Sequence, residues 1–568
     1  MTIQRPWLEH YPEGVPATID PDSYGSLVDV VEEAFERFRH RPAYSNFGRT
    51  LAYGDIDRLS AQFAAYLGSE LGLAKGERIS IMLPNVLQYP VALLGSLRAG
   101  LTVVNTNPMY TARELRHQLE DSGAVAIVVL DNFAHTAAES LAGTAVRHVV
   151  TTGIGDLLGF PRGALMNFAV KHLKKMVPDY HIDGAVRFND ALERGARQRP
   201  PQVQIGRDDI AFLQYTGGTT GIAKGAMLTH RNMIANMLQA DAWLGDLGKP
   251  GEEVVITALP LYHIFSLTAN GLVFMRLGGL NWLITNPRDM PGFVKSLRKV
   301  RFTALTGVNT LFNGLLHTPG FDALDFSALH LTLGGGMAVQ RTVADRWKQV
   351  TGCTLAEAYG LTEAAPAVCI NPLDLEAYNG SIGLPVPSTD VAIRDDEGRN
   401  LPIGETGELC VRGPQVMKGY WQRPRETAAV LADGWLRTGD IARMDARGYV
   451  YIVDRKKDMI LVSGFNVFPN EVEDVAAGHP GVLEVAAVGV PDEHSGEVVK
   501  LFVVRKDPTL TADALRHYLH DKLAGYKRPR HIEFRDELPK SNVGKILRRA
   551  LRDSEPAPAA SAVDHAQG

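Results

Sequence analysis

Cysteine is scarce in this sequence. Its 568 residues include only Cys353, Cys369 and Cys410, whose spacing fits no zinc or iron–sulfur site. Three thiols are too few for disulfide bonds to stabilise a chain of this length, which predicts a reducing, cytoplasmic environment. A long uncharged apolar run is also missing, because the best candidate, 267–284, contains an arginine and three glycines. Residues 1–15 lack a basic segment followed by an apolar one, so we expect no secretion signal.

The sequence also lacks a strong excess of one charge. It has 59 lysines and arginines against 64 aspartates and glutamates, a net charge of −5, which gives no reason to expect nucleic acid as a partner. With 45% hydrophobic and 22% charged residues the composition is globular. The length exceeds that of one ordinary domain and predicts at least two.

Apolar periodicity predicts an α/β fold. Strand-like runs at 79–83 and 126–130 alternate with helical patterns such as 91–97, which indicates βαβ units and largely parallel sheets. No internal repeat is evident.

The pattern changes after Asp454. Strands are predicted near 483–490 and 500–504 and a helix over 511–523, which together indicate a small, separate α+β domain. The final stretch, 554–568, is rich in alanine, proline and serine, and we expect it to be disordered.

The most informative segment is 215–230, YTGGTTGIAKGAMLTH. Its glycines let the backbone curl around an anion, and its hydroxyl and ammonium groups can bind phosphate oxygens. We therefore predict a phosphate-binding loop formed by Tyr215, Thr216, Gly217, Gly218, Thr219, Thr220, Gly221 and Lys224. The apolar run 210–215 predicts a buried strand that ends at this loop.

The loop is not a Walker A motif, because Lys224 follows alanine and precedes glycine, whereas that motif requires glycine before the lysine and serine or threonine after it. This register excludes a P-loop nucleotide hydrolase. A glycine-rich surface turn without a ligand is the alternative interpretation.

A second segment fits an adenosine phosphate. Gly334, Gly335 and Gly336 follow an apolar run and can expose backbone groups to a purine edge. In EAYGLTE, 357–363, Tyr359 offers a ring for stacking worth about 1–3 kcal/mol, and Glu363 is an oxygen ligand suited to Mg²⁺. By itself this segment also fits a buried tyrosine and a helix-capping threonine.

Three further segments carry charge. Asp440, in WLRTGD, is an acidic residue of the kind that holds ribose hydroxyls. By composition, the run DRKKD at 454–458 is a solvated turn or linker. The segment PKSNVGKILRR at 539–549 contains Lys545 and by itself fits an ordinary basic loop.

Together these segments resemble the acyl-adenylate-forming superfamily, which includes acyl-CoA synthetases, firefly luciferases and peptide-synthetase adenylation domains. The resemblance covers about residues 7–552 and is strongest to bacterial long-chain fatty-acid CoA ligases. The phrases that carry it are Ala223 before Lys224, LPLYHIFSLTANGL at 259–272, IVDRKKDMILVSGFNVFPNEVE at 452–473 and LPKSNVGKILRR at 538–549.

The resemblance implies an architecture. A large N-terminal adenylation domain, 1–453, would contain parallel and mixed sheets flanked by helices, together with a β-barrel-like subdomain. A small, mobile α+β domain, 454–553, would swing about a hinge at Asp454, and the tail 554–568 would follow it.

It also implies a reaction. A fatty carboxylate would attack the α-phosphate of ATP, and coenzyme A would then displace AMP to give the acyl-CoA. Lys545 would bridge the carboxylate and the α-phosphate, with Mg²⁺ held by Glu363 and Thr216. His263 would lie near the acyl carboxylate, with a core histidine as the competing interpretation, and Gly464 would line the CoA passage. The resemblance adds Glu357, Gly360, Thr362 and Arg455 to the ATP site.

Other functions share these motifs. They are a fatty-acyl-AMP ligase that loads a carrier protein, a medium-chain or aryl acyl-CoA ligase, and a luciferase-like oxygenase. A silent lipid- or nucleotide-binding protein would often lose Lys545, Glu363 or Lys224, and all three are present. Ala358 departs from the family pattern, since close relatives usually carry glycine there.

Segment 164–177, ALMNFAVKHLKKMV, bears on a membrane partner. Written as a helix, it gathers apolar residues on one broad face and places Asn167, Lys171, Lys174 and Lys175 opposite. Such a helix can lie on the inner face of an anionic membrane, or it can dock its apolar face on its own domain. A homodimer is a further hypothesis.

Overall fold

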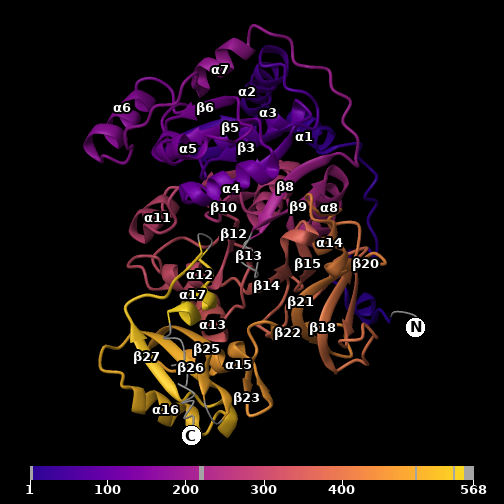
Figure 1. Cartoon of the computed structure of the whole chain (residues 1–568), viewed down its shortest axis with the longest axis vertical. Coiled ribbons are helices and arrows are strands. Elements are labelled where there is room, and N and C mark those ends of the chain that lie inside the picture. The colour runs from indigo at the N-terminus through magenta and orange to yellow at the C-terminus, as the bar shows by residue number, and fades with distance from the viewer. Residues whose placement is uncertain (1–3, 217–222, 493–494, 542–543, 555–568) are drawn as a thin grey trace, which may run out of the picture.

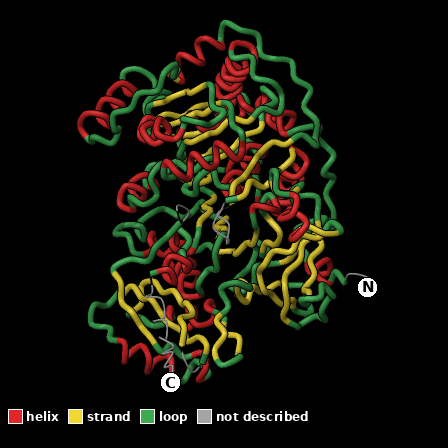
Figure 2. The backbone as a smooth tube through the Cα atoms, in the orientation of Figure 1, coloured by secondary structure: helices red, strands yellow, loops and turns green. Residues whose placement is uncertain are grey.

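The computed structural model describes residues 4–216, 223–492, 495–541 and 544–554. The strands of these residues form four sheets, shown in Figures 1 and 2. The tail predicted to be disordered lies outside the described residues except for Ser554. No described helix is both long enough and apolar enough to cross a membrane.

One sheet contains eight of the described strands in the order β19-β9-β8-β4-β3-β5-β6-β7. The six strands from β8 to β7 run parallel to their neighbours, and β9 and β19 pair antiparallel. The strands are β3 (Arg78–Met82), β4 (Thr102–Asn105), β5 (Ala126–Leu130), β6 (His148–Thr152), β7 (Val186–Arg187), β8 (Ile210–Thr216), β9 (Lys224–Thr229) and β19 (Gly419–Tyr420).

A second sheet contains nine of the described strands in the order β16-β15-β14-β13-β12-β10-β11-β1-β2. Its centre is parallel and both edges are antiparallel. The strands are β1 (Pro42–Asn46), β2 (Arg49–Ala52), β10 (Val254–Thr257), β11 (Leu280–Leu283), β12 (Ala304–Gly307), β13 (Leu331–Gly334), β14 (Leu355–Gly360), β15 (Ala367–Ile370) and β16 (Leu384–Pro385).

Helices connect and cover these two sheets (Figure 1). Several begin at side-chain caps, as where the Thr229 hydroxyl accepts a hydrogen bond from the Asn232 amide. The helices are α1 (Leu27–Arg37), α2 (Tyr53–Ala65), α3 (Gln88–Arg98), α4 (Ala112–Ser122), α5 (Ala134–Ser140), α6 (Arg162–Phe168), α7 (Phe188–Gly195), α8 (His230–Leu244), α9 (Ile264–Ser266), α10 (Phe274–Arg276), α11 (Met290–Leu297), α12 (Asn309–Leu316), α13 (Arg341–Thr351) and α14 (Pro424–Val430).

A third sheet, of five described strands, is antiparallel and stands where the resemblance implied a β-barrel-like subdomain. Its strands are β17 (Asp390–Arg394), β18 (Thr406–Arg412), β20 (Leu431–Ala432), β21 (Trp435–Met444) and β22 (Val450–Arg455). The long strand β21 carries Asp440, and β22 contains Asp454 near its end.

The C-terminal part forms the fourth sheet, in the order β24-β23-β26-β25 with β27 parallel to β26. Its elements are β23 (Ile460–Val462), β24 (Phe465–Val467), α15 (Pro469–Ala477), β25 (Val482–Asp492), β26 (Gly496–Arg505), α16 (Ala512–His520), β27 (His531–Arg535) and α17 (Arg548–Asp553). Apolar clusters pack on both faces of this sheet, so it has a core of its own.

The predicted fold class is confirmed. The strands expected at 79–83, 126–130 and 210–215 are β3, β5 and β8, and the apolar pattern at 91–97 lies inside α3. The helix expected over 511–523 ends earlier, at His520, and is followed by a turn.

The amphipathic segment 164–177 folds as α6 followed directly by a π-helix, Ala169–Leu173. The helix therefore ends four residues before the predicted boundary. Its apolar side chains Leu165, Phe168 and Leu173 are exposed, whereas Met166 packs against the core of the N-terminal part, so only part of the apolar face docks on its own domain.

An aromatic cluster packs between the second sheet and its helices α12 and α13. Trp347 of α13 is fully buried, and its ring centroid lies 4.8 Å from that of Phe312 and 5.4 Å from that of Phe321. Its indole N–H donates to the Thr332 hydroxyl of β13 at 3.3 Å. This cluster fixes α12 and α13 against the strand that ends at Gly334.

We predict that Trp347→Ala lowers the free energy of unfolding of this part by about 3–5 kcal/mol, because it opens a large cavity in a packed core. Urea denaturation followed by circular dichroism measures the change. Ile403→Ala, at a 42% exposed side chain, is the control and should shift stability by about 0.5 kcal/mol or less. Equal effects of the two variants would contradict this account of the core.

Candidate functional site

A cavity of about 710 Å³ opens where the first three sheets meet. It is reached by the ends of β8, β13 and β14, by β21 and by the loop that precedes α17. The predicted residues that line it are Thr216, Lys224, His263, Gly335, Gly336, Tyr359, Gly360, Thr362, Glu363, Asp440, Arg455 and Lys545. Residues more than 300 positions apart in the sequence therefore share one site.

One end of the cavity carries the groups predicted to bind phosphate. Thr216 and Lys224 face each other as the last pair of the β8–β9 ladder. The Lys224 ammonium group lies 5.2 Å from the ring centroid of Tyr420, whose hydroxyl donates to Glu363 at 2.7 Å. The loop between the two strands, with the predicted Gly217, Gly218, Thr219, Thr220 and Gly221, lies outside the described residues.

The groups predicted to bind adenosine lie on β14 and β21. The Tyr359 hydroxyl donates to the Asp440 carboxylate at 2.5 Å, and the Arg455 guanidinium lies 3.3 Å from the same carboxylate. Asp440 and Arg455 are also register partners in the β21–β22 ladder. The acid is thus fixed in orientation by a phenol on one side and a cation on the other.

Lys545 reaches the cavity from the C-terminal part. The Thr310 hydroxyl of α12 donates to the Gly544 carbonyl at 2.9 Å, which ties the lysine loop to the second sheet. Burial lowers the pKa of Lys545 to about 7, and the positive charge of Arg455 adds to the shift. A bound anion would favour the charged form of the lysine against both effects, so this ammonium group is suited to a negatively charged ligand.

His263 lines the cavity beside Lys545. Burial, with a smaller contribution from the Lys545 charge, lowers the pKa of His263 to about 4, so the imidazole is neutral at physiological pH. Its Nδ1 accepts a hydrogen bond from the Phe265 amide at 3.4 Å, which leaves the proton of the neutral ring on Nε2. In this state the ring is a hydrogen-bond donor and a poor proton acceptor.

Three predicted ATP-site residues do not line the cavity. Gly334 lies in β13, directly before the lining glycines. Tyr215 is buried, and its hydroxyl donates to Asp121 at 2.7 Å. Glu357 is buried, and accepts hydrogen bonds from the Val339 amide at 3.3 Å and the Tyr378 hydroxyl at 3.2 Å.

Glu357 has an unusual ionisation state. Burial raises the pKa of Glu357 to about 8, so the group is largely neutral at physiological pH. A neutral carboxyl group supports the adjacent cavity wall through hydrogen bonds without adding a negative charge beside the predicted nucleotide site.

Asp454, the predicted hinge, is fully buried at the end of the third sheet. Its carboxylate accepts one hydrogen bond from the backbone amide of Arg455 at 2.7 Å and another from the backbone amide of Asn470 at 2.8 Å. The Arg548 guanidinium lies 3.3 Å away and also pairs with Glu473 at 2.7 Å. Asp454 therefore joins β22, α15 and α17 through polar contacts.

Gly464 lies away from the cavity. It forms the turn between β23 and β24, with a φ of +83° and no atom within 4 Å of an added Cβ. The structure thus brings Lys545 to the cavity and leaves the predicted CoA-passage residue exposed on the C-terminal part.

Sequence reasoning missed Tyr420. This residue joins the phosphate end through Lys224 and Glu363, yet it comes from the short strand β19, which pairs with β9. A lone tyrosine between a glycine and a tryptophan carries no local signal. Only the long-range pairing of β19 brings it to the site.

The residues predicted to hold Mg²⁺ fit that ion sparsely. Thr216 and Glu363 both line the cavity and offer one hydroxyl and one carboxylate. Among the described residues no cluster of three or more histidine, cysteine, aspartate or glutamate side chains could form a closed metal site. One or two protein oxygens are what Mg²⁺ uses when phosphates supply most of its other ligands.

Comparisons with known proteins find relatives that match almost the whole chain. The family model of the AMP-binding enzyme matches residues 31–421, and that of the AMP-binding enzyme C-terminal domain matches residues 471–545. A long-chain-fatty-acid–CoA ligase of Escherichia coli is 58% identical over 97% of this chain and 98% of its own length.

More distant relatives also match most of the chain. A feruloyl-CoA synthase of an Amycolatopsis species is 36% identical over 90% of this chain and 96% of its own. Among solved structures, the anthranilate CoA ligase AuaEII, in complex with anthranoyl-AMP, superposes with a TM-score of 0.82 at 25% identity, covering 94% of this chain and 98% of that one. The matched region of the first family model alone spans more than half of the sequence, and the chain belongs to the AMP-binding enzyme family.

Proposed function

We propose that this chain is an AMP-forming long-chain fatty-acid–CoA ligase. The observation that carries the proposal is the meeting of Lys545 with Asp440, Arg455 and Tyr359 at one cavity, in a chain 58% identical over 97% of its length to a long-chain-fatty-acid–CoA ligase. The apolar part of the cavity lining, which includes Phe265, Leu333 and Ile370, would take the acyl chain.

In the first half-reaction, a carboxylate oxygen attacks the α-phosphorus of ATP. A phosphorus–oxygen bond forms, the bond from the α-phosphorus to the bridging oxygen breaks, and pyrophosphate leaves with the electron pair. Two anions must approach each other, so the step needs concentrated positive charge. Lys545 supplies it at the α-phosphate, and Lys224 supplies it at the pyrophosphate end.

Glu363 and Thr216 are the residues that would hold Mg²⁺. When bound, the ion neutralises phosphate charge. The hydrogen bond from Tyr420 to Glu363 would keep that carboxylate oriented toward the phosphates.

Asp440 would accept hydrogen bonds from the ribose hydroxyls, and Tyr359 would stack on the adenine. His263, neutral and protonated on Nε2, is suited to donate a hydrogen bond to the acyl carboxylate rather than to act as a base. Its role would then be to orient the nucleophile.

In the second half-reaction, the sulfur of CoA attacks the acyl carbonyl. The carbon–sulfur bond forms, the carbon–oxygen bond to AMP breaks, and the thiol proton goes to solvent. A thiol with a pKa of about 8.5 supplies some thiolate at neutral pH without a dedicated base. We infer that the C-terminal part, 454–553, turns about Asp454 between the half-reactions and exchanges Lys545 for Gly464 at the cavity.

The proposal is tested by incubating the protein with palmitate and ATP, together with either CoA or a carrier protein, and measuring AMP and the thioester product. We expect palmitoyl-CoA and AMP in equal amounts. A thioester on the carrier protein alone would identify the loading enzyme instead. Turnover of cinnamate-type acids in place of palmitate would favour an aryl acyl-CoA ligase.

We predict that Lys545→Ala slows adenylation by about 10²–10³-fold, because one preorganised cation is lost where negative charge develops. Palmitate-dependent exchange between pyrophosphate and ATP measures this step. Thioester formation from supplied palmitoyl-AMP should stay near the wild-type rate. Arg549→Ala, which removes an exposed charge four residues away, is the control, and equal loss in both half-reactions would refute the assigned role.

The pH dependence of adenylation should follow the ionisation of Lys545. Because burial lowers the pKa of Lys545 to about 7, the required ammonium form is lost as pH rises through this value. In the free enzyme kcat/KM for adenylation should therefore fall about tenfold per pH unit above it.

The matching variant is Lys545→Arg, whose guanidinium stays charged throughout this range. It should be slower than the wild type but should lack the alkaline decline. The same decline in both proteins would assign it to another group.

We predict that Gly464→Leu spares adenylation and impairs thioester formation, since an added side chain would obstruct the thiol passage. Gly464→Ala is the matched control, because it carries the same backbone strain at a φ of +83° with little bulk. The two half-reaction assays measure both variants. Similar thioester rates for alanine and leucine would show that bulk at this position is irrelevant.

A further inference from the structure

A cluster of large apolar side chains stands in solvent around α6. Phe160 is 93% exposed, Leu165 65%, Phe168 56%, Leu173 71% and Met176 57%. Exposed lone apolar residues are ordinary in folded proteins, but five within 17 consecutive positions form a patch that marks an interaction site. Figure 1 shows α6 projecting from the side of the N-terminal part.

The inward face of this helix combines one apolar contact, made by Met166 with the core, with small and polar contacts. A Cβ added at Gly163 would lie 2.3 Å from the Gly155 carbonyl oxygen, so only glycine permits this close approach. One turn later, the Asn167 amide oxygen accepts a hydrogen bond from the Gly155 amide at 2.7 Å. The Asn167 amide nitrogen donates to Asp156 at 2.7 Å.

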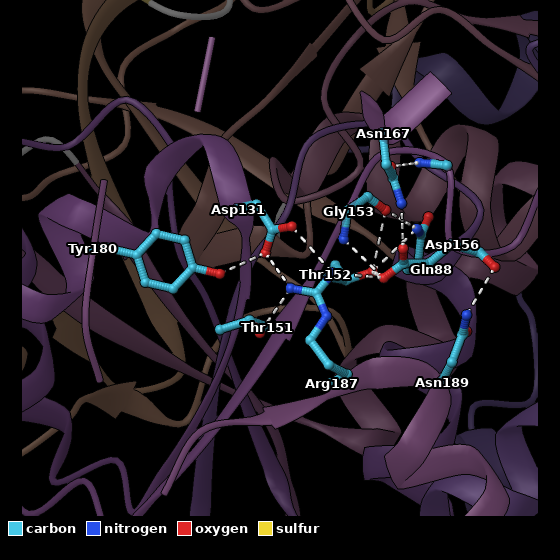
Figure 3. A network of polar contacts seen from close by, with 11 residues as sticks. Gln88, Asp131, Thr151, Thr152, Gly153, Asp156, Asn167, Tyr180, Arg187 and Asn189 are labelled. Atoms are coloured by element: carbon cyan, nitrogen blue, oxygen red, sulfur yellow. Dashed lines mark hydrogen bonds and ion pairs between the residues drawn. The ribbon is translucent and has the colours of Figure 1, made fainter. Parts of the chain in front are cut away.

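A network of polar contacts, drawn in Figure 3, supports that face. Asp156 also accepts hydrogen bonds from the Thr152 hydroxyl at 2.9 Å and from Arg187 at 3.2 Å. Arg187 bridges to Asp131, which accepts a hydrogen bond from the Tyr180 hydroxyl at 2.9 Å.

The end of the segment is fixed as well, because the Asn132 side chain donates to the Met176 carbonyl at 3.0 Å. The apolar side chains are therefore turned outward by a specific set of inward contacts. Their exposure is a property of the folded structure.

The charged residues within the segment that forms the patch have one sign. Residues 157–178 contain Arg162, Lys171, Lys174 and Lys175 and no aspartate or glutamate, in a chain whose net charge is −5. All four basic residues are exposed. A partner for this surface must offer both an apolar phase and negative charge.

We propose that the basic apolar patch, formed by Phe160, Leu165, Phe168, Leu173 and Met176 with Arg162, Lys171, Lys174 and Lys175, docks the enzyme on the surface of an anionic lipid bilayer. The apolar side chains enter the boundary between headgroups and acyl chains, and the lysines contact lipid phosphates. The choice of a bilayer rests in part on the proposed function, because a long-chain fatty acid partitions into that phase.

The proposal is tested by co-sedimenting the full chain with phosphatidylcholine vesicles that contain or lack phosphatidylglycerol. Binding should require the anionic lipid and should weaken with added salt. In K171E/K174E/K175E, partitioning should fall on the order of 100-fold or more, since each lysine at an anionic surface contributes about a factor of five. The control K295E/K299E/K506E makes the same charge change at exposed lysines elsewhere and should bind like the wild type.

The apolar contribution is tested separately with L165S/F168S/L173S. This variant should also lose vesicle binding, whereas L247S/I403S, at exposed apolar positions outside the patch, should not. None of these residues lines the cavity. Ligase activity on detergent-dispersed palmitate and the thermal unfolding midpoint should therefore stay at wild-type values, which shows that the variants are folded.

Three results would overturn the proposal. The first is that the wild type does not bind anionic vesicles. The second is that the two patch variants bind as well as the wild type. The third is that light scattering shows a dimer of the wild type, which only the serine variant loses, while that variant still binds vesicles. The last result would assign the patch to a second copy of the chain. Failure of the proposed function is distinguishable, because it would abolish palmitoyl-CoA formation in the wild type and leave vesicle binding intact.

Discussion

The buried ammonium group of Lys545 is the interaction on which the rest of the site depends. In the free protein, burial and the nearby charge of Arg455 disfavour its charged form more than Asp440 favours it. The site is therefore poised for anions, whose arrival restores the charge on the lysine and pairs it. Neutral Glu357 follows the same logic, because it adds no negative charge near the place where ATP and a carboxylate would meet.

Much of this could be predicted from the sequence. Parallel strands appear in the sequence as apolar runs, and the glycine-rich and charged segments are recognisable from their residues alone. β3, β5, β8 and twelve of the residues that line the cavity were therefore expected, whereas most of its apolar lining was not. Tyr420 could not be found, because its place depends on the pairing of β19 with β9. Residues such as Tyr215 and Glu357 were expected at the ligand and are instead buried beside it, since motif matching does not distinguish the two sides of a strand.

The helix at α6 illustrates a different limit. Periodicity shows that a helix has an apolar face, but it does not say which face the protein covers. Here Gly163 and Asn167 make inward contacts. A glycine followed four residues later by an asparagine is only a weak sequence signal for the buried face of a helix. Met166 is the one large apolar side chain of α6 that packs against the core, and a close backbone approach and a polar network make the other inward contacts.

The fourth sheet has apolar clusters on both of its faces, closed by α15 and α16 on one side and by α17 on the other. Its junction with the remainder includes polar contacts such as Thr310 to Gly544 and Asn313 to Leu483. Water can replace hydrogen bonds of this kind at little net cost, whereas it cannot replace a core. The C-terminal part therefore has a core that does not depend on its position, which is what the proposed turn about Asp454 would require.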